Sequence, residues 1–134
     1  SYKEQIKFYD QIKKSCINHG IISIFASEIN EELDLKNKIQ YINNLQPTLF
    51  VSFNSSEKES VNYFKGRFSE SVVGKKVAEH LSKTLKIEPI GKSSNILKET
   101  KSVGIVINGK FYQNLKIDLV IQSLFNSLQN QFES

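Results

Sequence analysis

Hydrophobic residues recur along the chain at two spacings, one typical of helices and the other of buried strands. The helical spacing predicts amphipathic helices over residues 2–18, 31–44, 69–85 and 117–132. Short apolar runs rich in β-branched residues predict strands over residues 21–25, 48–53, 61–64, 96–97 and 103–107. Gly20 is placed to end the first helix, and Ser69 to begin the third. The segment 88–91, which contains a proline and a glycine, predicts a turn.

The order of these elements favours an α/β fold. A strand, a helix and a second strand follow one another over residues 21–53, which makes one βαβ unit. The runs 48–53 and 103–107 are apolar almost throughout, as in strands that are buried on both faces of a parallel sheet. We therefore predict a single α/β domain over residues 1–134, with a mostly parallel sheet of about five strands and helices on both faces.

Composition and charge restrict the partners only in part. Hydrophobic residues make up 39% and charged residues 24% of the chain, which is ordinary for a globular protein. The net charge of +4 suits anionic partners, although solvated lysines scattered along the chain explain it as well. No apolar segment approaches the roughly 20 residues that span a bilayer, so we expect no membrane span. The single cysteine, Cys16, excludes an internal disulfide and an all-cysteine zinc site.

Two of the predicted strands end in similar polar sequences, Phe53-Asn54-Ser55 and Ile107-Asn108-Gly109. The carboxyl ends of parallel strands meet at one edge of a sheet, where α/β folds usually hold their ligands. Amide side chains can bind a ligand there, but they cannot take up a proton at neutral pH. The chain has only two histidines, in separate predicted segments, and it lacks the GxGxxG and GxxxxGK[ST] patterns of nucleotide-binding folds. Composition and spacing favour a binding domain over an enzyme.

The order and spacing of the segments resemble the zinc-dependent N-acetylmuramoyl-L-alanine amidases of the amidase-3 type, which occur in autolysins and endolysins. In that family a helix ends at a glycine and is followed by a strand that runs into a Thr-Arg-Asp-like segment, and residues 20–28 are similar to this stretch. Residues 49–56 fall on its strand of the form hydrophobic-Ser-hydrophobic-His-Ala-Asn, and residues 61–64 resemble its short aromatic strand. Residues 96–114 match the spacing of its Val-Leu-Arg segment and the later Val-Leu-Val-Glu-hydrophobic-Gly-Phe segment with its Asn. The resemblance implies an amidase-3-like fold.

The same resemblance implies that the catalytic groups of the family are absent. Asn54 stands in the place of a zinc-binding histidine, and Asn108 in the place of the catalytic glutamate. A further zinc ligand would fall near Ser1, and the family's first strand, with its His-Gly-Gly motif, would lie before residue 1. A neutral amide is a poor zinc ligand and cannot act as a general base. We therefore expect a degenerate domain that lacks the first strand, with no zinc, no other cofactor and no catalytic residue.

From this resemblance we expect a non-catalytic module that binds the cell wall, such as the targeting domain of an endolysin or autolysin. It would hold peptidoglycan or an attached anionic polymer in the former substrate groove, keeping ground-state contacts without transition-state stabilisation. The side chains expected to bind the ligand are Asn54, Ser55, Ser56, Lys98, Asn108 and Tyr112. A purely structural alternative for Asn54 and Asn108 is that they cap strand ends and bond to loop backbone.

Two other functions stay open. One is an active zinc amidase whose ligands align differently. The other is a pseudoenzyme regulator or assembly protein that meets its partner across the sheet edge left by the absent strand. The same edge suggests a homodimer. We expect the domain at the bacterial cell wall or outside the cell, encoded by a bacterium or a phage, and we expect no nucleic-acid partner.

Overall fold

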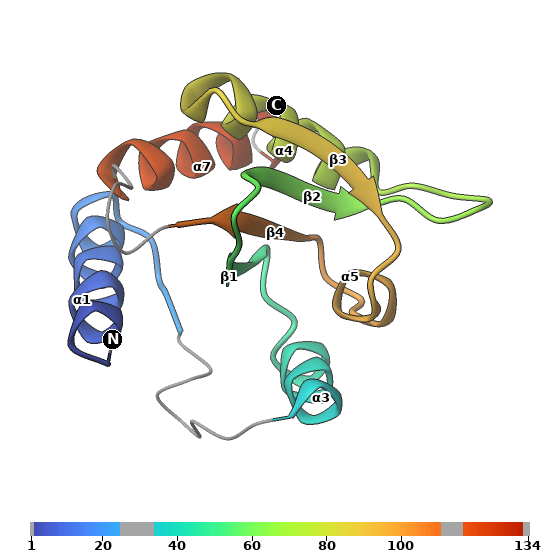
Figure 1. Ribbon diagram of the computed structural model, residues 1–134, viewed down its shortest axis with the longest axis horizontal. Coiled ribbons are helices and arrows are strands. Elements are labelled where there is room, and N and C mark those ends of the chain that lie inside the picture. The colour runs from blue at the N-terminus through green and yellow to red at the C-terminus, as the bar shows by residue number, and fades with distance from the viewer. Residues whose placement is uncertain (1, 25–33, 111–116, 133–134) are drawn as a thin grey trace.

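The computed structural model describes residues 2–24, 34–110 and 117–132. In this part of the chain the helices are α1 (Tyr2–Asn18), α3 (Leu35–Leu45), α4 (Val72–Leu85), α5 (Asn95–Glu99) and α7 (Ile117–Phe132). The strands are β1 (Phe50–Ser55), β2 (Ser60–Phe64), β3 (Glu88–Lys92) and β4 (Gly104–Gly109) (Figure 1). The long predicted helices 2–18 and 117–132 are confirmed, and so are the strands over 48–53, 61–64 and 103–107, with small shifts at their ends.

The four strands form one mixed sheet in the order β1-β4-β2-β3. β1 pairs with β4 and β2 pairs with β3 in parallel, whereas β2 and β4 are antiparallel. The prediction of a mostly parallel sheet of about five strands is therefore wrong for the described residues. The reason is the short connection 56–59 between β1 and β2, because joining parallel strands takes a crossover of a dozen residues or more. β2 consequently runs back against β1, and β4 lies between the two.

Three local predictions are corrected by the structure. Residues 21–24, predicted as most of a strand, lie outside the sheet with Ile22 and Ile24 exposed, and the rest of that prediction falls outside the described residues. Segment 88–91 forms most of strand β3 instead of a turn, since Pro89 is tolerated in a strand at the edge of a sheet. Residues 96–97 belong to the short helix α5, where Leu97 is buried.

Local hydrogen bonds explain where two of the helices end or begin. After α1, Gly20 adopts the left-handed conformation with φ 70°, as expected for a glycine that ends a helix. The N–H of Ile21 donates to the carbonyl of Cys16 at 2.8 Å, which completes a Schellman motif. The cap of α4 is Ser71 and not Ser69 as predicted, because the Ser71 hydroxyl accepts from the N–H of Gly74 at 2.9 Å.

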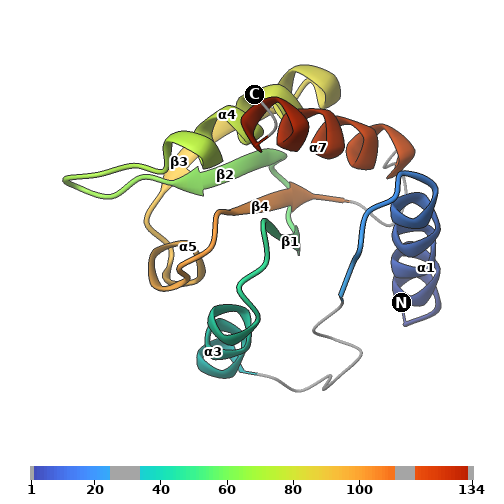
Figure 2. The ribbon, with the colours of Figure 1, turned by 180° about the vertical axis from the view of Figure 1, so that it is seen from behind.

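Helices cover both faces of the sheet, as predicted (Figures 1 and 2). α1, α4 and α7 pack together on one face, over a core that takes alternate residues from the central strands. The largest fully buried side chains of this core are Leu81, Ile105, Ile107, Val61, Val77 and Val120. On the other face a smaller cluster joins Phe50, Leu97 and Val106, and it connects α5 to the sheet. None of the helices within the described residues is long and apolar enough to cross a membrane.

Candidate functional site

A row of four hydrogen-bonded polar side chains crosses the sheet where β1 and β4 end. Asn54 Nδ2 donates to Asn108 Oδ1 at 3.0 Å, and Asn108 Nδ2 donates to Ser60 Oγ at 3.1 Å. Ser60 Oγ in turn donates to Asn62 Oδ1 at 3.1 Å. We call these four residues, Asn54, Asn108, Ser60 and Asn62, the amide row.

The strand register explains why these side chains meet. Asn54 is paired with Asn108 in the parallel ladder of β1 and β4, and Ser60 is paired with Asn108 in the antiparallel ladder of β2 and β4. Paired residues on neighbouring strands are about 5 Å apart and point to the same side of the sheet. Asn62 lies two residues after Ser60 on β2, so its side chain points to that side as well. The row therefore follows from strand order and alternation, with no contribution from a loop.

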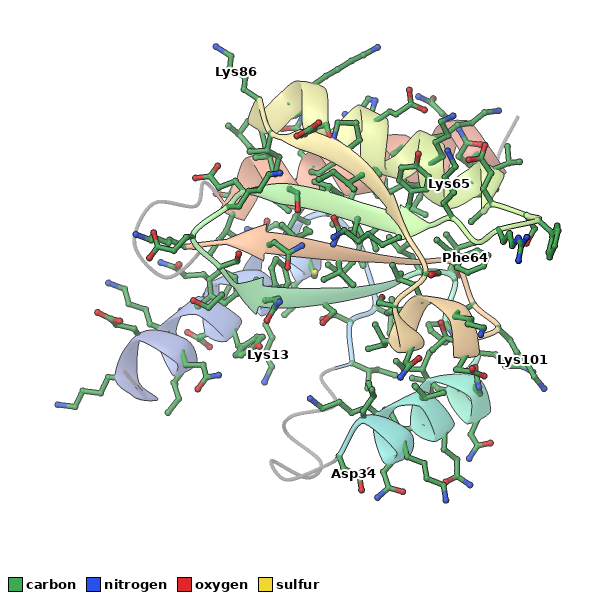
Figure 3. The ribbon with its side chains drawn as sticks, turned by 45° about the vertical axis from the view of Figure 1, so that its right-hand side comes forward. Lys13, Asp34, Phe64, Lys65, Lys86 and Lys101 are labelled. Atoms are coloured by element: carbon green, nitrogen blue, oxygen red, sulfur yellow. The ribbon has the colours of Figure 1, made fainter. Side chains whose placement is uncertain are left out.

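The amide row lies on the face of the sheet that α5 covers only in part. Phe50 and Val106 precede the two row asparagines by an even number of residues on their strands, so they share this face, and they pack against Leu97 of α5. Helix α5 lies toward the end of the sheet where β4 begins, whereas the row lies where β4 finishes (Figure 3). Asn54 is exposed, and Ser60 is buried with 5% of its surface exposed. The row is thus exposed at Asn54, buried at Ser60, and half-buried at its other end, Asn62.

The hydrogen-bonding groups left over in the row define what it can bind. An asparagine side chain has two N–H donors and one carbonyl acceptor. Within the described residues, the bonds of the row leave the Asn54 carbonyl, one N–H each of Asn54 and Asn108, and both N–H groups of Asn62 without a protein partner. These groups can bind hydroxyl, carbonyl and amide groups of a ligand. They cannot accept a proton at neutral pH, so the row offers no general base.

Two charged residues that follow the ends of β1 and β4 are paired with each other. Lys110 follows β4 directly, and Glu57 lies in the connection after β1. Their side chains form an ion pair with 3.3 Å between Lys110 Nζ and Glu57 Oε2. Both side chains are well exposed, so the pair contributes at most about 1 kcal/mol to stability. It does, however, offset the charge of Lys110 beside the row.

The structure brings together two of the six residues that the sequence suggested, Asn54 and Asn108. Their amides bond to each other and not to loop backbone, so the purely structural alternative of loop capping is not what the described residues show. Ser60 and Asn62 were missed. Ser60 begins β2 and Asn62 is its third residue. Only the antiparallel register of β2 against β4 reveals that Ser60 reaches Asn108 and joins Asn62 to the row.

The other suggested residues lie elsewhere. Ser55 follows Asn54 on β1 and so points to the opposite face of the sheet. Ser56 extends the ladder through its backbone, with its N–H donating to the Gly109 carbonyl at 3.1 Å. Lys98 is exposed on α5, which lies toward the end of the sheet where β4 begins, away from the row. Tyr112 lies outside the described residues.

Comparisons with known proteins find similarity in structure only. No protein-family model matches the sequence, and no curated protein matches it. The CwlD amidase from Clostridioides difficile, solved in complex with the GerS lipoprotein, is similar with a TM-score of 0.65 at 14% identity, over 98% of this chain and 85% of that chain. The N-acetylmuramoyl-L-alanine amidase AmiC2 of Nostoc punctiforme gives a TM-score of 0.64 at 11% identity, over 95% of this chain and 81% of that chain. The chain has the fold of the N-acetylmuramoyl-L-alanine amidases.

A third structure with this amidase fold is the catalytic domain of the CD27L endolysin, which targets Clostridia difficile. It gives a TM-score of 0.62 at 16% identity, over 97% of this chain and 83% of that chain. These matches confirm the amidase-like fold that the order of segments predicted. At such low identity the likeness extends to the fold and does not assign a role to any residue.

The amidase resemblance implies zinc, and the amide row does not fit this metal. Zinc sites in proteins are built from imidazole, thiolate and carboxylate groups, whereas the row consists of three amides and a hydroxyl. The two histidines belong to other parts of the fold: His19 follows α1 with its Nδ1 2.8 Å from the Ser15 carbonyl oxygen, and His80 lies in α4. Within residues 2–24, 34–110 and 117–132, no group of three or more His, Cys, Asp or Glu residues could hold a metal ion.

Proposed function

We propose that this domain is a non-catalytic module that binds the bacterial cell wall, with the amide row as its ligand site. The observation that carries the proposal is the hydrogen-bonded row of Asn54, Asn108, Ser60 and Asn62 in a domain with an amidase fold. Proteins that share the fold are named for a bond between N-acetylmuramic acid and L-alanine, which belongs to peptidoglycan. Peptidoglycan is rich in the hydroxyl and amide groups that the row can bind.

The chemistry of the row supports binding over hydrolysis. Hydrolysis by a metal-bound water needs a metal and a base, and neutral amides supply neither. A site that keeps contacts to the ground state without stabilising the transition state binds its ligand and leaves it intact. The domain would then serve as the targeting part of an endolysin or autolysin, acting at the cell wall or outside the cell of a bacterium, or encoded by a phage. Its partner would be peptidoglycan or an attached anionic polymer.

A protein partner is the second candidate. β1 forms one edge of the sheet, and β1 carries neither the charged residues nor the proline that protect the other edge strand, β3. CwlD, which has the same fold, was solved in complex with a lipoprotein. Within the described residues β1 is thus an edge strand without such protection, which would suit a regulator or assembly protein, or pairing of two copies of the chain. Sedimentation that detects only monomer at high concentration would count against a homodimer.

Pull-down on purified sacculi tests the wall-binding proposal. We expect the unmodified chain to sediment with sacculi at moderate salt. Two neighbouring residues of β1 provide a matched comparison, because Asn54 belongs to the row and Ser55 points to the other face. Asn54→Ala should lower the bound fraction, and Ser55→Ala should leave it unchanged. A chain that stays in the supernatant, or two variants that behave alike, would contradict the proposal.

A further inference from the structure

A projecting hairpin joins β2 to α4 at the end of β2 that lies away from the amide row. It comprises residues 65–71 and extends from the body of the domain in both opposite views (Figures 1 and 2). We call it the β2–α4 hairpin. Since β2 begins at Ser60, in the row, and ends at Phe64, just before the hairpin, the two features lie at opposite ends of this strand.

The hairpin is held in a defined shape by its backbone. Lys65 and Glu70 face each other in an antiparallel bridge, and the N–H of Gly66 donates to the Ser69 carbonyl at 2.8 Å. At the base, the N–H of Ser71 donates to the Phe64 carbonyl at 3.0 Å. These bonds fix the two arms, so the side chains at the tip are presented in a definite arrangement.

An apolar side chain stands at the tip without packing into the fold. Phe68 is 91% exposed, and Val72, which begins α4 beside the hairpin, is 61% exposed. The Arg67 guanidinium lies over the Phe68 ring, 5.3 Å from the ring centre. A phenylalanine so exposed contributes little to the core, and its apolar surface is available to a partner.

The hairpin and the first turns of α4 are rich in basic residues. Between residues 65 and 76 there are four basic residues and one acidic residue, a net charge of +3, whereas the whole chain carries +4. The five are Lys65, Arg67, Lys75, Lys76 and Glu70. Glu70 is paired with Lys75, with 3.6 Å between Lys75 Nζ and Glu70 Oε1. The backbone N–H of Lys65 also donates to the Lys92 carbonyl at 2.9 Å, which brings β3 and another basic residue to the base of the hairpin.

We propose that the β2–α4 hairpin is a docking element for an anionic lipid membrane surface. Basic residues near such a surface are attracted by its negative potential, and an exposed aromatic side chain enters the boundary between headgroups and acyl chains. The exposed apolar side chains of Phe68 and Val72 favour a membrane over a soluble polyphosphate as the partner, because a polyphosphate would bind through the charges alone. The proposal goes beyond wall binding, because the amide row at the other end of β2 stays free when the hairpin is engaged.

The absence of tryptophan from the chain provides a direct test. Phe68→Trp places a single tryptophan at the tip, and its emission should shift to shorter wavelength with vesicles of phosphatidylglycerol and phosphatidylcholine, but not with phosphatidylcholine alone. Ile22→Trp is the control, because Ile22 is 94% exposed and lies outside the hairpin. Its emission should not change. No shift for Phe68→Trp, or equal shifts for the two variants, would overturn the proposal.

Vesicle co-sedimentation measures the contributions of the aromatic side chain and of the basic charge to membrane binding separately. Phe68→Ser should weaken binding to anionic vesicles by about tenfold or more, since it removes the aromatic side chain that would enter the membrane surface. Arg67→Gln should weaken it by about fivefold, the effect of one basic residue near the surface. Ile22→Ser should have no effect. Phe68→Ser should also unfold at the same urea concentration as the unmodified chain, because the side chain is exposed. Vesicle binding that is unchanged by Phe68→Ser, or that soluble polyphosphate abolishes without any tryptophan shift, would overturn the membrane assignment.

Discussion

Removing the central asparagine of the amide row should destabilise the domain by a predictable amount. Asn108→Ala deletes two hydrogen bonds, one to Asn54 at 3.0 Å and one to Ser60 at 3.1 Å. A hydrogen bond between neutral groups contributes about 0.5–1.5 kcal/mol net. The bond to Asn54 is exposed and belongs at the low end of that range, whereas Ser60 is buried and belongs at the high end. Ser60 keeps its bond to Asn62, so no hydroxyl is left without a partner.

The expected loss is therefore about 1–2 kcal/mol in the free energy of unfolding. Urea denaturation followed by far-ultraviolet circular dichroism measures it, and the slope of the free energy against urea should not change. A double-mutant cycle with Asn54→Ala isolates the bond between the two asparagines, with an expected coupling of about 0.5–1 kcal/mol. Ser55→Ala, on the opposite face of β1, should show no coupling to Asn108→Ala. An Asn108→Ala variant as stable as the unmodified chain, or a cycle without coupling, would refute the hydrogen-bonded row.

Three further predictions concern the packing that supports the site. Gly104→Ala should cost about 1–3 kcal/mol in urea unfolding, because a Cβ there would lie 2.0 Å from the Phe50 ring, and a Phe50→Leu background should lessen this loss. Ser71→Ala should lower the free energy of unfolding by about 1 kcal/mol, because it removes the hydroxyl that caps α4 at the Gly74 N–H. Ser71→Asp should retain most of this stability, since aspartate can also cap a helix. Equal losses in the two variants would contradict the capping role. Burial raises the pKa of the Cys16 thiol above its ordinary value of 9.0, and a hydrogen bond from Ser23 lowers the pKa by a smaller amount. The thiol should therefore react with alkylating reagents far more slowly in the folded chain than in urea. As the pH rises, the thiol ionises in the unfolded chain before it ionises in the folded chain. The stability that comes from burying the neutral thiol is therefore complete below pH 9 and is lost as the pH rises further. A free energy of unfolding that increases above pH 9 would contradict this pKa shift.

The sequence predicts the long helices well because each repeats its apolar spacing over several turns. α1 and α7 show this, and the glycine that ends α1 adds a specific signal in Gly20. Short segments carry much less information. The two apolar residues at 96–97 are compatible with either a strand or a helix. In the structure they belong to a helix, and Leu97 packs from this helix against the sheet. β3 contains a proline and two charged residues, and only its place at the edge of the sheet makes it a strand.

The candidate site was predicted in part for a similar reason. Asn54 and Asn108 follow apolar runs, so the sequence alone indicates that they lie at strand ends. Ser60 and Asn62 become part of the row through the insertion of β4 between β1 and β2, which no local pattern shows. Lys98 was suggested by the resemblance of its segment to the family's Val-Leu-Arg pattern, and the helix α5 keeps it at the other end of β4.

The proposed function is tested most directly by incubating the chain with purified sacculi in the presence of added zinc. The bound fraction and the soluble muropeptides released are measured in the same sample, together with the zinc content of the purified protein. We predict that the protein sediments with the sacculi, releases no muropeptides and contains no stoichiometric zinc. Release of muropeptides by a protein that holds one zinc per chain would show an active amidase and contradict the central claim.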